Sequence, residues 1–260
     1  MKAQVIIDHL NQQGPWVNFD KTRDIVLFGD PTLEVKKVGV CWIVTMNVIK
    51  QAALQGINFI VTHENCFYEE STSPHQKLLE ARKQKMALLA THGICVARCH
   101  DVWDRMPKYG IPDSWGDAMG LTFDPRPENS FYKYAHFEPC TVAEIAHKIA
   151  VGIKPYGQDS VTVLGDPHKL ISSLAIGTGA ITDVFNMLKE EADCLVVTDD
   201  GITNWIASQY SVDKDIPLII THHPVAEIPG MHNMVEYLRL NFKDTDFVYL
   251  EEGFQFHTYK

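Results

Sequence analysis

Short apolar runs alternate with amphipathic segments along most of the chain. The runs are the length of buried strands and lie between turn residues, whereas the longer segments repeat apolar positions at helical spacing. The predicted strands are residues 38–44, 58–62, 94–99, 160–164, 174–177, 194–198, 217–221 and 247–251. The predicted helices are residues 5–12, 47–55, 75–92, 113–120, 141–152, 183–191, 202–210 and 230–240. Strands that alternate with helices in this way predict an α/β fold with largely parallel sheets.

Turn and cap residues mark several of the predicted boundaries. Asn47 is a candidate N-cap, and Gly93 is typical of a helix C-terminus. Thr141 with Glu144 has the spacing of a capping box. Residues 16–28 and the polar stretch 69–74 have no clear period, so we predict that they are irregular.

The chain contains two stretches that follow the same plan. Residues 38–64 can be laid over residues 174–200 without a gap, so that Val61-Thr62 falls on Val197-Thr198. Each stretch is a strand–helix–strand unit, although chance similarity among such units is an open alternative. We therefore predict two similar α/β lobes with mixed, largely parallel sheets and a site in the cleft between them. Residues 123–130, rich in proline and charge, divide the lobes into 1–125 plus 232–260 and 126–231.

The composition is that of a soluble globular protein with no basic footprint. The 260 residues are 45% hydrophobic and 22% charged, and the formal net charge is −10. This acidity argues against nucleic acid as a partner, because phosphate binding requires basic side chains. The first 14 residues lack the apolar centre of a signal peptide, and no apolar run approaches the roughly 18 residues of a membrane span. We expect a cytoplasmic protein with no membrane association, whose six scattered cysteines are reduced and buried.

Four predicted strands are followed closely by side chains of the types that bind metal ions. These side chains are His63 and Glu64, His100 to Asp104, Asp199 and Asp200, and His222, His223 and Glu227. Imidazole and carboxylate together suit Zn, Fe, Mn, Co or Ni, and a carboxylate can bridge two ions. Ligands in open α/β sheets collect beyond the carboxyl ends of strands. We take five residues as the candidate ligands of two divalent ions: His63, Glu64, Asp104, His223 and Glu227.

Each of these residues also has a purely structural interpretation. A histidine after a buried strand often makes only a loop hydrogen bond. Asp104 could cap a turn, and Glu227 could be a charge at a helix N-terminus. For Asp199 and Asp200 we favour capping of the helix near residue 202. Four such strand ends in one chain nevertheless favour a shared metal site over coincidence.

Other chemistries find no motif in the sequence. The chain has neither a GxSxG elbow nor a GxxxxGK[ST] loop, so a triad hydrolase and a P-loop enzyme have no support in the sequence. The segment GTGAIT at 177–182 departs from the dinucleotide pattern GxGxxG. Cys66, close to His63, has no neighbour that marks it as an activated nucleophile.

The order of these motifs resembles a known family. VTHE at 61–64, HDVWD at 100–104, VVTDDG at 196–201 and HHPVAE at 222–227 are similar to motifs of the Nif-three-like family, whose members are also described as type 2 GTP cyclohydrolase homologues or dinuclear-metal-centre proteins. The resemblance extends from about residue 35 to 240, without the inserted middle domain of longer members. It implies a two-lobed α/β fold and assembly into a homohexamer.

The resemblance also assigns ligands by position. The family's ligands fall on His63, Glu64, Asp104, His223 and Glu227, while His222 stands where the family has glycine. Glu64 replaces a second histidine, which weakens the nitrogen preference and favours a harder ion such as Mn or Mg, or leaves one site weak.

The leading hypothesis is a metal-dependent hydrolase that acts on a nucleotide or another phosphate-bearing small molecule. In this hypothesis His222 or His100 could shuttle protons. The alternatives are a non-catalytic metal-binding oligomeric scaffold or regulator, and an α/β protein without metal.

Overall fold

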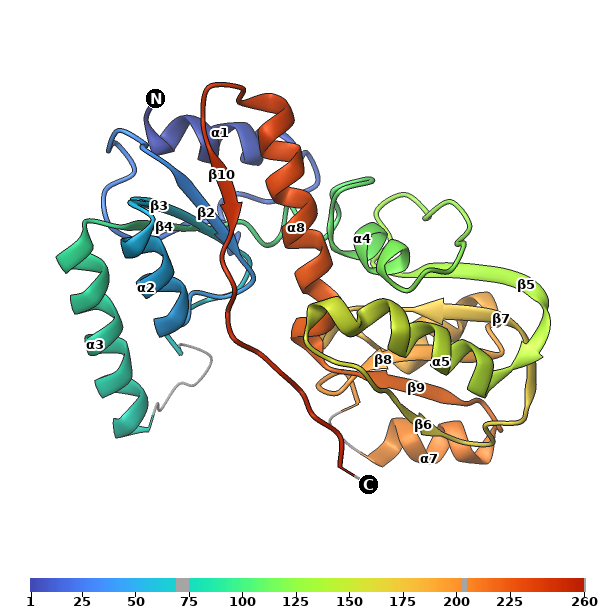
Figure 1. Cartoon of the computed structure of the whole chain (residues 1–260). Helices are drawn as coiled ribbons and strands as arrows, with labels where there is room; N and C mark the ends of the chain where they lie inside the picture. Colours follow the sequence, from blue (N-terminus) through green and yellow to red (C-terminus); the bar gives the residue numbers. More distant parts are fainter. Residues whose placement is uncertain (69–74, 203–204, 260) are drawn as a thin grey trace. The chain divides into compact units, whose positions relative to one another are not determined.

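The computed structural model describes residues 1–68, 75–202 and 205–259, so the predicted irregular stretch at 69–74 lies outside the described residues. The chain divides into two compact units (Figure 1). Unit 1 comprises Met1–Met106 and Met231–Gly253, and unit 2 comprises Pro107–Gly230 and Phe254–Lys260. Each unit contains a five-stranded mixed sheet, which confirms the predicted pair of α/β lobes.

Unit 1 is built on a sheet with the strand order β1-β4-β3-β2-β10. Four of these strands are parallel, and only β1 runs antiparallel to its neighbour β4. The elements of unit 1 are α1 (Ala3–Gln12), β1 (Val26–Phe28), β2 (Val38–Cys41), α2 (Met46–Leu54), β3 (Phe59–Thr62), α3 (Gln76–His92), β4 (Cys95–Arg98) and β10 (Phe247–Tyr249). Strand β1 was missed because three half-buried residues inside an irregular stretch give no period.

Helices α2 and α3 cover one core of unit 1. Val48 and Ile49 of α2 and Leu89 of α3 pack with Ile60 and Val96 of the sheet, and all five are at most 1% exposed. Every residue of β2 and β3 is buried, as expected for parallel strands covered on both faces.

Cap residues account for the ends of these helices. Gly93 ends α3 as predicted, in the left-handed conformation with φ 60°. The predicted cap of α2 at Asn47 is wrong, because Thr45 accepts the hydrogen bond from the Val48 N–H.

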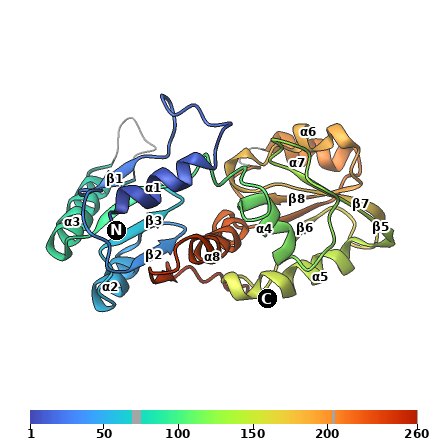
Figure 2. The same ribbon diagram turned by 90° about the horizontal axis from the view of Figure 1, so that it is seen from above.

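Unit 2 has the strand order β5-β7-β8-β9-β6, with a parallel centre and an antiparallel strand at each edge. Figure 2 shows α5 on one face of this sheet and α6 and α7 on the other. The elements are α4 (Ile111–Ala118), β5 (Lys133–Thr141), α5 (Val142–Ile153), β6 (Thr162–Leu164), β7 (Leu170–Ile176), α6 (Val184–Met187), β8 (Cys194–Thr198), α7 (Trp205–Asp213) and β9 (Leu218–Thr221), with short 3-10 turns at Lys154–Tyr156, Gly179–Ile181 and Leu188–Glu190. The capping box of Thr141 and Glu144 at the start of α5 is confirmed.

The segment before β5 belongs to the core of unit 2. Trp115 and Met119, both fully buried, pack with Ile145 and Ile149 of α5. This packing moves the division between the units to Pro107, whereas the proline-rich stretch had suggested residue 126. Strand β5 itself was not predicted from the sequence.

Helix α8 (His223–Asn241) begins seven residues before its predicted start at 230. Proline is unfavourable in a helix interior, so Pro229 gives no local signal for a helix that contains it. The structure continues the helix through Pro229. Val225 and Ala226, fully buried in the core of unit 2, hold its first turns in place.

The two predicted repeats are both parallel strand–helix–strand units, but their registers differ by one residue. Val40 pairs with Val61, whereas the equivalent Ile176 pairs with Val196 rather than Val197. A gap-free overlay therefore does not hold in three dimensions.

Candidate metal centre

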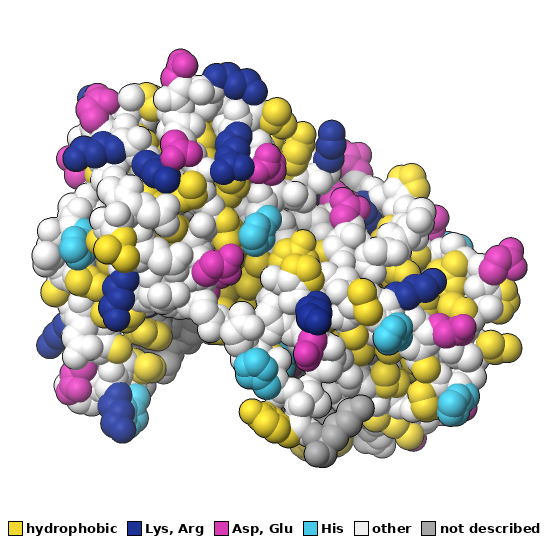
Figure 3. Space-filling model, in the orientation of Figure 1, with side chains coloured by type: hydrophobic (Ala, Val, Ile, Leu, Met, Phe, Trp, Pro, Cys, Tyr) yellow, Lys and Arg dark blue, Asp and Glu magenta, His cyan; other side chains and the backbone are white. Residues whose placement is uncertain are grey.

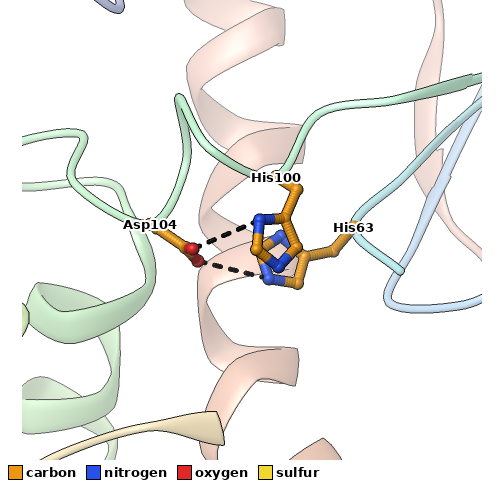
Figure 4. A group of neighbouring side chains, drawn as sticks. All are labelled: His63, His100 and Asp104. Carbon is orange, nitrogen blue, oxygen red and sulfur yellow. Dashed lines mark ion pairs between the residues drawn. The ribbon is translucent and has the colours of Figure 1, made fainter. Parts of the chain in front are cut away.

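Two parallel strands of unit 1 end in metal-binding side chains. His63 directly follows β3, and His100 and Asp104 lie in the turn after β4. Because β3 and β4 are neighbours in the sheet, their carboxyl ends bring these three residues together (Figure 4). Residues 100–104 form a turn in which the Asp104 N–H donates to the His100 carbonyl over 2.8 Å, so both side chains lie on the same side.

The Asp104 carboxylate faces one nitrogen of each of two imidazoles. His63 Nε2 is 3.4 Å from Asp104 Oδ1, and His100 Nδ1 is 3.3 Å from Asp104 Oδ2. The two rings are stacked, with centroids 4.5 Å apart and planes 13° from parallel. Two ligands that bind the same zinc ion at about 2.0–2.1 Å and a tetrahedral angle are about 3.3 Å apart. The observed separations fit a shared ion and are long for ordinary charged hydrogen bonds.

The orientation of His63 favours coordination through Nε2. The side chain is fully buried, and its Nδ1 lies 3.3 Å from the Cys99 carbonyl, which can only accept. A proton on Nδ1 leaves the Nε2 lone pair directed at Asp104. Metal-binding histidines commonly donate their other ring N–H to a carbonyl or carboxylate, and this hydrogen bond fixes the tautomer.

Glu64 belongs to the same strand end but is held by an arginine. Arg98 Nη2 donates to Glu64 Oε2 over 2.6 Å, and Arg98 Nε donates to the His63 carbonyl over 2.8 Å. The other oxygen, Oε1, is 3.6 Å from His100 Nε2. The structure therefore brings Glu64 next to the three-residue cluster, with its charge balanced by Arg98.

A carboxylate from a distant loop holds the turn that carries His100 and Asp104. Asp24 accepts from the backbone N–H groups of His100, Asp101 and Val102, the latter two over 2.9 Å each. In return, Asp101 Oδ2 accepts from the backbone and hydroxyl donors of residues 22–23, each over 2.9 Å. This reciprocal exchange fixes the loop and the turn against each other.

In unit 2, His223 and Glu227 come from the first turn of α8 and face each other. His223 Nε2 is 2.9 Å from Glu227 Oε2, and His223 Nδ1 is 2.6 Å from Asp200 Oδ2. Burial lowers the pKa of His223, but the charges of Glu227 and Asp200 outweigh it and raise this pKa to about 11. A histidine between two carboxylates, one of them only 5% exposed, matches the arrangement in which an outer carboxylate orients a metal-binding imidazole.

A glycine leaves room for this pair. Gly179 has φ +55°, and a Cβ added there would lie 2.4 Å from Glu227 Oε1 and 2.7 Å from His223 Nε2. The side chains of His223 and Glu227 therefore pack directly against a bare backbone.

The neighbouring His222 makes a separate pair at the surface. Its Nδ1 is 2.6 Å from Asp199 Oδ2, and its ring stacks on Phe256 with centroids 3.9 Å apart. Asp199 also accepts from the His223 N–H over 3.0 Å. Asp199 and Asp200 each pair with a histidine, while their role in capping the helix near residue 202 stays a prediction, because residues 203 and 204 lie outside the described residues.

The predicted ligands thus fall into one cluster in each unit. Unit 1 joins His63 and Asp104 with Glu64 beside them, and unit 2 joins His223 and Glu227. Their combination into a single two-ion site stays a prediction. The sequence placed His100 among the side chains that follow a predicted strand but did not select it as one of the five candidate ligands, although its four-residue spacing from Asp104 was the signal of a shared face.

A model of the Duf34/NIF3 (NGG1p interacting factor 3) family matches residues 1–252. The chain belongs to this family. The resemblance seen in the sequence is thereby confirmed.

Relatives and solved structures agree with the family. A GTP cyclohydrolase 1 type 2 homolog of Chlamydia pneumoniae is 24% identical over 221 residues, which cover 82% of this chain and 83% of the relative. A protein of the same name from Clostridium perfringens is 24% identical over 266 residues and covers 97% of each chain. The crystal structure of a Staphylococcus aureus hypothetical protein matches with a TM-score of 0.80 and 18% identity over 99% of each chain. At that identity, the structural match shows the fold alone.

Proposed function

We propose that this protein binds two divalent metal ions, drawn from Zn, Fe, Mn, Co and Ni, and uses them to hydrolyse a nucleotide or another phosphate-bearing small molecule. The observation that carries the proposal is the His63, His100 and Asp104 cluster, whose donor separations of 3.3 and 3.4 Å fit a shared ion. His223 and Glu227 are the proposed ligands on unit 2. Two relatives are named GTP cyclohydrolase 1 type 2 homolog, which supports a nucleotide as the substrate class.

The charge of the chain explains why ions would be needed. The formal net charge is −10, and the described acidic and basic side chains are interspersed on the face in Figure 3. Such a surface does not attract a phosphate by itself. A bound divalent ion supplies local positive charge, polarises a phosphoryl or carbonyl oxygen and activates water.

The protein side chains would hold the ions and orient the ligand rings. Asp104 and Glu227 provide carboxylates, His63 and His223 provide imidazoles, and Asp200 fixes the ring of His223 through its 2.6 Å contact. Cysteine chemistry is not supported, because five of the six cysteines are buried and burial raises the pKa of the Cys95 thiol to about 11. A thiol with a raised pKa is a poor nucleophile near neutral pH.

The test of metal binding is elemental analysis of the purified protein beside Asp104→Ala and His223→Ala. Asp246→Ala, a change of an exposed aspartate in unit 1, is the matched control. We expect the wild type and the control to retain divalent metal after dialysis, and each ligand variant to lose part of it. A wild type with no more metal than the two ligand variants would refute the proposal.

The test of hydrolysis is a panel of nucleoside triphosphates and phosphomonoesters with and without added divalent ions. Turnover should require metal and should be lost in both ligand variants. Equal residual activity in the variants would identify a contaminant. Full metal occupancy with no turnover would reject the hydrolase and favour a non-catalytic metal-binding scaffold.

Assembly is a further part of the proposal and rests on the family resemblance. A homohexamer of 29.4 kDa chains would have a mass of about 176 kDa. Light scattering on the eluting protein measures this mass directly, and a monomer at assay concentration would reject the hexamer.

Among the described residues, no helix is long and apolar enough to cross a membrane.

A further inference from the structure

We propose that the imidazole of His100, and not the carboxylate of Glu64, is the third ligand of the ion bound by His63 and Asp104. This inference rests on the metal binding proposed above and revises its ligand set. It assigns Glu64 to an outer position, where it orients His100.

Glu64 already forms an ion pair with Arg98. One carboxylate oxygen, Oε2, accepts from Arg98 Nη2 over 2.6 Å and from the Asn65 N–H over 3.3 Å. The Glu64 and Arg98 side chains are only 14% and 11% exposed, so the ion pair is shielded from water. Pulling Glu64 toward a metal would leave a guanidinium charge behind in a poorly solvated place, which is costly.

Arg98 is itself held in position. Its backbone N–H donates to the Ile25 carbonyl over 2.8 Å, and its Nε donates to the His63 carbonyl over 2.8 Å. The guanidinium therefore bridges the backbone of His63 and the side chain of Glu64. This fork geometry fixes the Glu64 carboxylate and leaves only Oε1 directed toward the cluster.

The His100 ring already lies next to both His63 and Asp104. Figure 4 shows the ring of His100 stacked on the ring of His63, each with a nitrogen directed at the Asp104 carboxylate. His100 is fixed at the backbone by Asp24, which accepts its N–H. The ring needs no large movement to share an ion with His63 and Asp104.

The other nitrogen of the His100 ring is directed at Glu64. His100 Nε2 faces Glu64 Oε1 at 3.6 Å, while Nδ1 faces Asp104. Histidines that bind a metal through one nitrogen commonly direct the other N–H at a carboxylate. Arg98, Glu64 and His100 thus follow one another toward the proposed ion, with a hydrogen bond between the first two and a 3.6 Å approach between the last two. His100 Nδ1 also lies 2.9 Å from Asp101 Oδ1, so an ion bound at Nδ1 would take the place of a proton between these two atoms.

The exchange of roles changes the metal preference. With Glu64 as a ligand, the site would have one imidazole and two carboxylates, which suits harder ions such as Mn or Mg. With His100 as the ligand, the site has two imidazoles and one carboxylate. This donor set favours Zn, Fe, Co or Ni over Mg.

Histidine ¹⁵N NMR of the full chain, titrated with Zn²⁺, tests the assignment residue by residue. His100→Asn and Glu64→Gln are the test variants, and His92→Asn, at an exposed position in the last turn of α3, is the matched control. We expect zinc to shift His63 Nε2 and His100 Nδ1 in the wild type, the control and Glu64→Gln. In Glu64→Gln zinc affinity should fall by roughly 10–100-fold, the cost of an outer-position change.

His100→Asn should weaken zinc binding at His63 by more than Glu64→Gln does. Unfolding curves without zinc show whether each variant keeps its fold. The inference is wrong if zinc shifts His63 and leaves both His100 nitrogens unchanged, or if Glu64→Gln abolishes the His63 shift while His100→Asn preserves it. A wild type in which zinc shifts no histidine would instead reject the proposed metal binding itself.

Discussion

Replacing Gly179 with alanine is the most direct perturbation of the His223–Glu227 pair. The new Cβ would lie 2.4 Å from Glu227 Oε1 and 2.7 Å from His223 Nε2. Ordinary van der Waals contact begins at 3.4 Å, so the carboxylate must move by about 1 Å. Such a shift breaks the 2.9 Å contact between the two side chains.

The magnitude has two parts. Alanine in the left-handed conformation that Gly179 adopts costs about 1–2 kcal/mol. Loss of one charge-assisted hydrogen bond costs about 1.5–3 kcal/mol more. Gly120→Ala is the matched control in unit 2, because Gly120 has φ +67° and a Cβ added there has no atom within 4 Å. Its cost should be the conformational part alone.

Urea unfolding of the metal-free proteins measures both costs, and zinc titration measures the consequence for binding. We expect Gly179→Ala to be less stable than Gly120→Ala by about 1.5–3 kcal/mol. Zinc binding at His223 should weaken in Gly179→Ala and stay unchanged in Gly120→Ala. Equal stability and equal zinc affinity in the two variants would refute the reasoning.

Three further predictions concern two buried carboxylates and one helix cap. Burial raises the pKa of Glu252 to about 7, from 4.5, so its contribution to stability is full below pH 4.5 and is lost as pH rises through 7. Urea unfolding should show a loss of about 3 kcal/mol across this window, and Glu252→Gln should flatten it; an unchanged slope would contradict the assignment. Asp24→Ala leaves three N–H groups of the turn after β4 without their acceptor and should cost at least about 2 kcal/mol, with Asp24→Asn closer to the wild type. Thr141→Ala removes the cap of α5 and should cost about 1 kcal/mol in the same assay, whereas no loss would show that the cap is dispensable.

The sequence by itself determined the elements whose cause is local. Strand β8 was predicted at its observed bounds because five consecutive buried residues form an apolar run between polar ones. Gly93 and the Thr141 capping box act within a few residues, so they are visible in the letters alone. His223 and Glu227 are four residues apart, and because both lie in α8 this local spacing brings their side chains together.

Strand β5 was decided by its neighbours. Its burial alternates imperfectly, Pro139 interrupts it, and the pairing shifts register between His136 and Cys140. Such an edge strand is stabilised by its ladder to β7, which no local pattern encodes. The start of α8 likewise depends on a core that Val225 and Ala226 enter, against the local preference of Pro229.

The roles of Glu64 and His100 show the same division at the level of chemistry. Adjacency to His63 made Glu64 the natural candidate ligand in the sequence. Arg98, 34 residues later in the chain, reaches Glu64 only because β3 and β4 pair in parallel, and the same pairing brings His100 to His63. Residue types and spacing determined which side chains could bind a metal. Tertiary structure decided which of them already have a partner, because the partners come from neighbouring strands.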